Sequence, residues 1–245
     1  MRLPARFSTV IAAAALACVC TGASAQSSSS QTSPQITPAQ QAAEQTSGNG
    51  AYIAINPLAG VRYDNRFDLT LAPAYDHMKA GPSLLQGANL GGLELDGSYW
   101  LTKRWGAEGS FRPYVGTSGA APNDQKIDGP FVSEYFFTGG PEWLGPHNEH
   151  GDLIAHILVG GVDGNFQQDL RGNSPSVVGF YNNQIAPAVI MGGHIDLNRS
   201  GHWVFRMSPD AVMTHYSTNY GGKISQFDIN AAFSVGLEYK FSKKR

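Results

Sequence analysis

His215 and Ser217 are the two residues whose types and spacing most directly suggest catalysis. Residues two apart in an extended strand point to the same face, so an imidazole and a hydroxyl would lie side by side there. A serine next to a histidine base is a common nucleophile of acyl-transfer enzymes. Asp228 is the nearest acidic candidate, but it has the opposite parity on the last predicted strand. The alternative is a polar strand end without a catalytic role.

The stretch His147-Asn148-Glu149-His150 has the composition of a metal site. It falls in a predicted turn and lacks the helix that would place two histidines on one face. We therefore interpret it as a solvated turn and predict neither a metal nor a cofactor.

A third group consists of charged residues that share the polar face of alternating segments. By parity, eleven acids accompany only three fixed cations on this face. Isolated buried charges are costly, so these groups must pair, hold protons or sit in water. They form either a hydrated ion-pair network or a narrow cation-preferring path. The predicted network contains Glu94, Asp96, Glu108, Arg112, Glu134, Asp196, Arg206, Asp210, Asp228, Glu238 and Lys240; Asp68, Asp76, Glu142, His156 and His194 share its parity.

Strict alternation of apolar and polar residues predicts the strands that carry these side chains. The clearest case is FDINAAFSVGLEYKF at residues 227 to 241. Six segments are clear and two, 131–143 and 152–164, are ambiguous. The eight predicted strands are 67–77, 92–101, 105–115, 131–143, 152–164, 185–197, 203–216 and 227–241. The pattern predicts an all-β, eight-stranded antiparallel transmembrane β-barrel.

The connections between these strands alternate in length. Segments 78–91, 116–130, 165–184 and 217–226 are long, 102–104 and 198–202 are short, and 144–151 is intermediate. Long loops at one end and short turns at the other are typical of outer-membrane barrels. The polar face is rich in Ala, Ser and Gly, which suits a narrow lumen, so the large apolar face is predicted to meet lipid. A soluble lipocalin-like barrel would invert the two faces.

The first 25 residues have the pattern of a cleaved secretory signal peptide, with Arg2 and Arg6 before a short apolar run and small residues at Ala23 and Ala25. Ala15-Leu16-Ala17-Cys18 loosely resembles a lipobox, which leaves lipidation as an alternative. Residues 26–50 are rich in Ser, Gln and Thr and are predicted to be a disordered periplasmic tether. The barrel is assigned to 51–245, with Arg62 and Arg66 suggested as cations that cover its periplasmic mouth.

Composition excludes several function classes. Both cysteines, Cys18 and Cys20, lie in the predicted signal peptide, so a disulfide framework and a cysteine site are excluded from the mature chain. The 17 basic and 19 acidic residues give no basic footprint for nucleic acid. Charged residues make up only 15% of the chain.

The signal peptide, the eight alternating segments and the closing GLEYKF together resemble small outer-membrane β-barrel proteins of the outer-membrane protein A transmembrane type. The resemblance implies outer-membrane location after export and an aromatic residue at the end of the last strand that the barrel-assembly machinery reads. Here that residue is Phe241, and the four residues SKKR that follow it displace the signal from the terminus. The His215-x-Ser217 pair also resembles that of outer-membrane lipid A deacylases. Thr218 stands where that family has Asn, and its Glu on the last strand has no match.

The sequence therefore predicts a non-enzymatic, monomeric outer-membrane barrel with a structural or surface-interaction role. Its expected partners are outer-membrane lipid, the assembly machinery and an unidentified partner of the external loops. A lipid A deacylase-like hydrolase and a narrow cation-preferring pore are the alternatives.

Overall fold

The computed structural model describes residues 56–82, 84, 87–120, 127–219 and 221–241. The predicted signal peptide and tether, and the start of the predicted barrel domain, lie outside the described residues. Among the residues that are described, no helix is long and apolar enough to cross a membrane.

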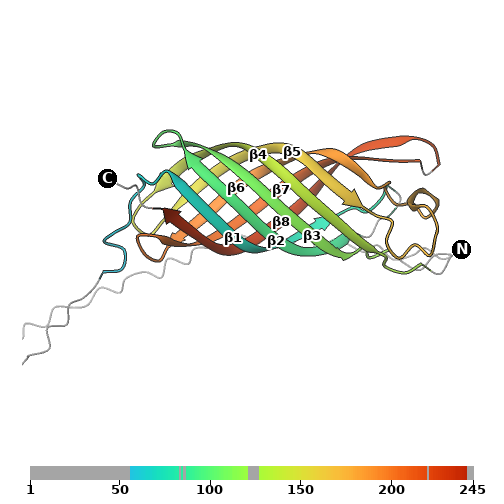
Figure 1. The fold of residues 1–245 in the computed structure, drawn as a ribbon, viewed down its shortest axis with the longest axis horizontal. Helices are drawn as coiled ribbons and strands as arrows, with labels where there is room; N and C mark the ends of the chain where they lie inside the picture. Colours follow the sequence, from blue (N-terminus) through green and yellow to red (C-terminus); the bar gives the residue numbers. More distant parts are fainter. Residues whose placement is uncertain (1–55, 83, 85–86, 121–126, 220, 242–245) are drawn as a thin grey trace, which may run out of the picture. The chain divides into compact units, whose positions relative to one another are not determined.

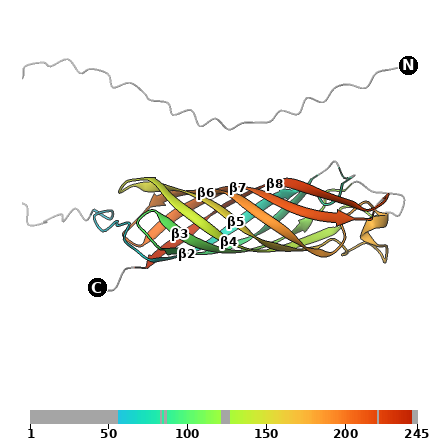
Figure 2. The ribbon, with the colours of Figure 1, turned by 90° about the horizontal axis from the view of Figure 1, so that it is seen from above.

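Eight antiparallel strands form a closed barrel, in which each strand pairs with the next and β8 returns to pair with β1. Figure 1 and Figure 2 show the strands winding obliquely around a common axis. A short 3₁₀ helix, η1 (Pro175–Val177), precedes β6. The strands are β1 (Phe67–Met78), β2 (Ala88–Trp100), β3 (Trp105–Thr117), β4 (Phe131–His147), β5 (Gly151–Asn165), β6 (Gln184–Asn198), β7 (Trp203–Thr218) and β8 (Ile224–Phe241). The predicted fold class is confirmed.

The period-two pattern places the two faces as predicted. On β8, Phe233 is 46% exposed on the outer face, whereas Ser234 is buried in the lumen. The two ambiguous segments are strands whose inward positions are also partly apolar, since Val132, Phe136 and Leu158 are buried beside polar neighbours. An apolar lumen lining is what made their alternation weak.

The strand ends define two ends of the barrel. The turn-side end carries the connections 101–104, 148–150 and 199–202, and the loop-side end carries 79–87, 118–130, 166–183 and 219–223. The predicted alternation of long and short connections holds for 79–87, 118–130 and 166–183, and the segment predicted as intermediate becomes a short turn because β4 continues to His147. The segment predicted as a long loop at 217–226 is largely strand, because β7 and β8 extend as a paired hairpin from Ser217↔Ser225 to Thr218↔Ile224.

The lumen is filled by two kinds of side chain at different heights. Charged groups occupy its turn-side and middle parts, including Arg112, Arg206 and Lys240. The loop-side part holds a buried apolar cluster that includes Phe136, Phe166, Phe180, Tyr181 and Tyr216. The barrel wall thus encloses a polar network topped by an aromatic layer.

Candidate functional site

Arg206 is the centre of the turn-side network. Its guanidinium donates to both carboxylate oxygens of Asp196, at 2.8 and 2.7 Å, and to the hydroxyl of Thr70 at 3.0 Å. It also lies 2.5 Å from Glu238. Paired planar hydrogen bonds of this kind are stronger and more directional than neutral ones. Arg206 therefore ties β7 to β6, β8 and β1 across the lumen.

Tyr63, from the segment before β1, covers the turn-side mouth. Its hydroxyl donates to the backbone oxygen of Asn148 at 2.7 Å and accepts from the amide of Asn198 at 2.9 Å. The ammonium of Lys240 lies 4.8 Å from the centre of the Tyr63 ring and 3.1 Å from Asp152. Burial, followed by the negative charge of Asp152, raises the pKa of Tyr63 to about 12, so its hydroxyl remains a donor at neutral pH.

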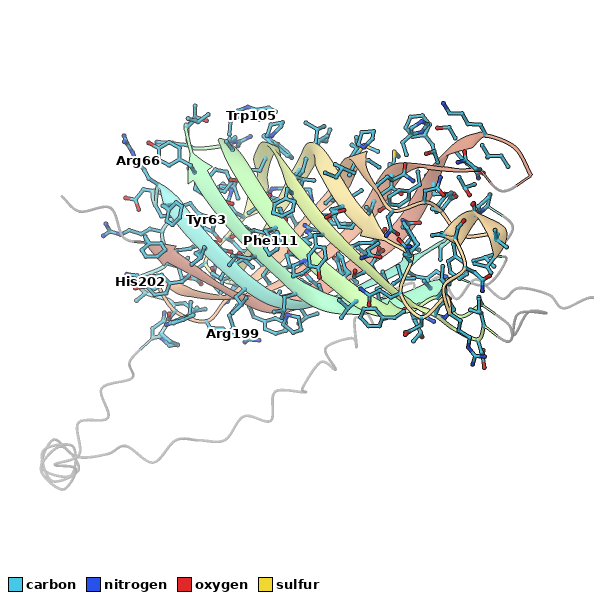
Figure 3. The ribbon with its side chains drawn as sticks, turned by 45° about the vertical axis from the view of Figure 1, so that its right-hand side comes forward. Tyr63, Arg66, Trp105, Phe111, Arg199 and His202 are labelled. Carbon is cyan, nitrogen blue, oxygen red and sulfur yellow. The ribbon has the colours of Figure 1, made fainter. Side chains whose placement is uncertain are left out.

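The suggested role of Arg62 and Arg66 at this mouth is wrong. Both side chains are exposed, and Figure 3 places Arg66 at the turn-side end of the barrel with Tyr63 and His202. Tyr63 and Asn65 cover the mouth instead, Asn65 by donating to Asp68. Lys240 already contacts Asp152 at this mouth, and the Tyr63 ring lies over its ammonium.

Arg112 is the cation of the middle layer. It donates to Asp210 at 2.5 Å and to Ser110 at 2.9 Å, and its Nε lies 3.4 Å from Glu94. Asp210 then accepts from His156 Nε2 at 3.0 Å. The chain of contacts therefore runs from a fixed cation on β3 to an imidazole on β5.

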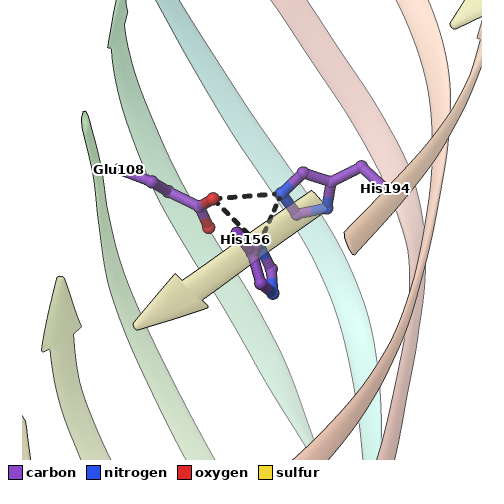
Figure 4. A group of neighbouring side chains, drawn as sticks. All are labelled: Glu108, His156 and His194. Atoms are coloured by element: carbon purple, nitrogen blue, oxygen red, sulfur yellow. Dashed lines mark hydrogen bonds and ion pairs between the residues drawn. The ribbon is translucent and has the colours of Figure 1, made fainter. Parts of the chain in front are cut away.

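Beside this pair, Glu108, His156 and His194 bring three donor atoms together, from β3, β5 and β6 (Figure 4). Glu108 Oε2 lies 3.0 Å from His156 Nδ1 and 3.2 Å from His194 Nε2, and the two nitrogens are 3.2 Å apart. All three side chains are fully buried. Among the described residues, these three form the group with the composition and proximity to hold a metal ion.

The loop-side layer pairs its acids with tyrosines. Tyr216 donates to Glu134 at 2.5 Å, and Tyr181 donates to Asp228. Burial and the neighbouring Asp228 raise the pKa of Tyr181, which keeps the phenol protonated. The rings of Tyr181 and Tyr216 each lie within 6 Å of Phe166, at 5.9 and 5.2 Å between centroids. The two phenols therefore each bond to one buried acid from within an apolar cluster.

His215 and Ser217 each form a side-chain hydrogen bond to a different residue in the structure. Both have the outward parity that the sequence predicts, but the Ser217 hydroxyl donates to Gln184 at 2.9 Å, while His215 Nε2 lies 2.8 Å from the hydroxyl of Ser225. Asp228 points inward to Tyr181. The predicted nucleophile and base therefore bond to other residues.

All eleven acids and three cations predicted to face the lumen are buried there. They do not form one network. Glu94, Asp196, Asp210 and Glu238 contact arginines, whereas Glu134 and Asp228 bond to tyrosines. The carboxylate oxygens of Asp76 and Asp96 have no hydrogen-bond partner among the described residues.

Sequence reasoning missed Asp152, which makes twelve buried acids, and the tyrosines 63, 181 and 216. Asp152 was readable from its parity on β5, since it has the same parity as His156. Tyr63 and Tyr181 come from connections, where alternation carries no signal.

The exposed turn predicted at His147 to His150 is present. His147 Nδ1 bonds to the backbone of Gly145, and His150 lies 3.5 Å from Glu149 with both side chains largely in solvent. The interpretation as a solvated turn agrees with these contacts.

Comparison with known proteins identifies the fold. No protein-family model matches the chain, and no curated protein sequence is significantly similar. Among solved structures, the outer membrane protein OprG from Pseudomonas aeruginosa is similar with a TM-score of 0.51 and 15% identity, covering 75% of this chain and 99% of that one. The fold is that of small outer-membrane β-barrels.

Two further structures align over similar lengths with lower scores. Ail, the attachment invasion locus protein of Yersinia pestis, has a TM-score of 0.43 and 18% identity, covering 72% of this chain and 99% of that one. Neisserial surface protein A has 0.45 and 13%, covering 71% and 97%.

Proposed function

We propose that this chain is a non-enzymatic outer-membrane barrel with a closed lumen, whose role is structural or is contact at the cell surface through its loops. The relation to the outer-membrane protein A type, the cleaved signal peptide, the monomeric state and recognition of Phe241 by the assembly machinery belong to the same proposal. The fold shared with OprG supports the membrane location.

The outer face supports contact with lipid. Large apolar side chains such as Leu71, Phe137 and Leu237 are each more than half exposed along the wall. Exposing so wide an apolar band to water would be unfavourable, whereas contact with lipid hydrocarbon would not. Trp105, Trp143 and Trp203 are exposed at the turn-side end, where an aromatic girdle of a membrane barrel is expected.

The filled lumen is the main observation that favours a closed barrel over a pore. Ion pairs of Arg112 and Arg206 span the interior, and the aromatic cluster with Phe166 and Tyr181 lies across its loop-side end. At the other end, a cavity of about 10 Å³ under Tyr63 has room for about one water molecule. A path for ions would require several of these buried contacts to break.

Bilayer conductance tests the closed lumen. Protein purified from the outer-membrane fraction should give no channel steps in a planar bilayer. The matched variant Arg112→Ala/Arg206→Ala removes two guanidinium groups but leaves the aromatic cluster across the loop-side end, so it should also give no steps. Cation-selective steps from the natural protein would support the pore alternative, and recovery of the protein in the soluble periplasm would overturn the membrane location.

The hydrogen bonds of Ser217 and His215 support a non-enzymatic role, because neither group activates the other. His215 Nδ1 has no hydrogen-bond partner among the described residues, so the third group that usually orients a catalytic base is missing from them. The mass of lipid A in cells that express the protein should be unchanged. A mass loss that disappears in Ser217→Ala or in Ser225→Ala would establish the hydrolase alternative.

A further inference from the structure

Three donor atoms in the middle of the lumen form a nearly equilateral triangle. Its sides are the contacts of 3.0, 3.2 and 3.2 Å among Glu108 Oε2, His156 Nδ1 and His194 Nε2. Figure 4 shows the two rings and the carboxylate directed toward one another. Four-coordinate zinc with bonds of about 2.0 Å has neighbouring ligand atoms about 3.3 Å apart. The triangle therefore has the size of one face of such a coordination sphere.

We infer that Glu108, His156 and His194 bind a divalent transition-metal ion inside the barrel. Two imidazole nitrogens and one carboxylate oxygen are a donor set used for zinc and for other first-row metals. The inference is independent of the proposed function, because it concerns what stabilises the lumen.

Hydrogen bonding alone does not satisfy this arrangement when Glu108 is ionised. If both facing nitrogens carry protons and donate to the carboxylate, the contact of 3.2 Å between the imidazoles joins two donors. If one nitrogen keeps its lone pair, its contact with Glu108 joins two acceptors. A cation that accepts all three lone pairs removes the conflict.

The remaining ring nitrogens are held as metal-binding histidines usually are. His156 Nε2 lies 3.0 Å from Asp210, and His194 Nδ1 lies 2.8 Å from the hydroxyl of Ser208. Such outer contacts fix the tautomer and the orientation of each ring. Asp210 is itself anchored by Arg112 at 2.5 Å.

Glycine makes room for this outer contact. Gly192 is paired with Asp210 across β6 and β7, and a Cβ at residue 192 would lie 2.0 Å from Asp210 Oδ1 and 2.5 Å from the backbone oxygen of Pro209. Any larger residue would displace the carboxylate that orients His156.

Charge and burial favour a structural ion. Twelve acids are buried in the described barrel with three fixed cations, Arg112, Arg206 and Lys240, so a divalent cation offsets part of the excess. The three ligand side chains are 0% exposed, so an enclosed water molecule would complete the four-coordinate sphere and a substrate would have no route to the ion. The ion would cross-link β3, β5 and β6 from inside and would be captured as the barrel closes.

Refolding with cobalt tests the site, because tetrahedral Co²⁺ absorbs visible light with an intensity that reports its geometry. The full chain, unfolded in urea and refolded into detergent with Co²⁺, should retain one ion per barrel after desalting and show the tetrahedral spectrum. Zn²⁺ should displace this spectrum at refolding and raise the melting temperature. The variants Glu108→Gln and His194→Gln should lose the stoichiometric ion and the spectrum.

Two further variants separate ion binding from folding defects and from surface histidines. Ser208→Ala keeps all three ligands and should bind about 10- to 100-fold more weakly, because it removes the partner of one imidazole. His147→Asn/His150→Asn changes only the exposed turn and should leave binding unchanged. The inference would be overturned if the natural protein refolds but retains no cobalt after desalting. It would also be overturned if cobalt binding is lost only in the His147→Asn/His150→Asn variant.

Discussion

The turn-side and loop-side parts of the lumen solve the problem of filling a narrow barrel in different ways. On the turn side, Arg206 is held by Asp196, Glu238 and Thr70, all supplied by strands. On the loop side, Phe166 and Tyr181 enter from the connection between β5 and β6 and pack on Tyr216. One part is closed by charge pairing within the wall and the other by apolar burial of a loop.

The difference shows which contacts fix the relative positions of the strands and which contacts attach the loop to the barrel. Buried ion pairs gain little net stability, because the cost of removing charges from water offsets their attraction, but breaking one pair is costly. Aromatic burial is favourable by itself and tolerates small shifts. The ion pairs therefore fix the relative positions of strands, while the aromatic layer fastens the loop to the barrel.

The largest expected effect is in the turn-side part. Arg206→Met should destabilise the barrel by about 3 to 5 kcal/mol, because it leaves Asp196 and Glu238 buried without their cation. Urea unfolding in detergent micelles measures this change. Arg199→Met, which removes an exposed cation from a neighbouring turn, is the matched control and should change stability by less than about 0.5 kcal/mol. Equal effects of the two variants would mean that Arg206 does not hold the network together.

A smaller effect is expected in the loop-side part. Phe166→Ala should cost about 3 kcal/mol through lost burial and the cavity it leaves. It should also expose the connection 166–183 to proteases while the strands stay intact. Limited proteolysis followed by mass spectrometry identifies the cut sites, with Phe227→Ala on the outer face as the control. Protection of the connection in Phe166→Ala would show that the loop is anchored by other contacts.

The smallest effect is expected from the hydrogen bond between a tyrosine and a buried acid in the loop-side part. Tyr216→Phe removes the hydroxyl that donates to Glu134 at 2.5 Å but keeps the ring in the aromatic cluster. Leaving a buried acceptor without its partner costs about 1 to 3 kcal/mol, so a loss of about 2 kcal/mol is expected. Comparing Tyr216→Phe with Tyr216→Leu separates the hydroxyl from the ring. Unchanged stability in Tyr216→Phe would show that Glu134 does not depend on this phenol.

The predicted strand pattern placed the three candidate metal ligands on the lumen face but did not predict that they contact one another. Parity placed Glu108, His156 and His194 on the lumen face, and each lies three to five residues from the turn-side end of its strand in the structure. Similar distance from one end was a weak signal, because barrel stagger sets the actual heights of the strands. Glu108 lies opposite Gly140 on β4, where a Cβ would lie 2.0 Å from the backbone oxygen of Ile157, so β4 contributes no side chain at that position.

The sequence by itself determined the number of strands, the two faces of each and the alternation of short and long connections. Side chains of a strand alternate with a period of exactly two, so local order fixes which residues turn inward. Only the tertiary structure decided which inward groups meet. Barrel stagger sets the relative heights of strands, and long side chains such as Arg206 reach across the lumen to acids far away in sequence. It also decided that Tyr63 and Tyr181 close the two ends, because connections have no periodicity that could predict where they pack.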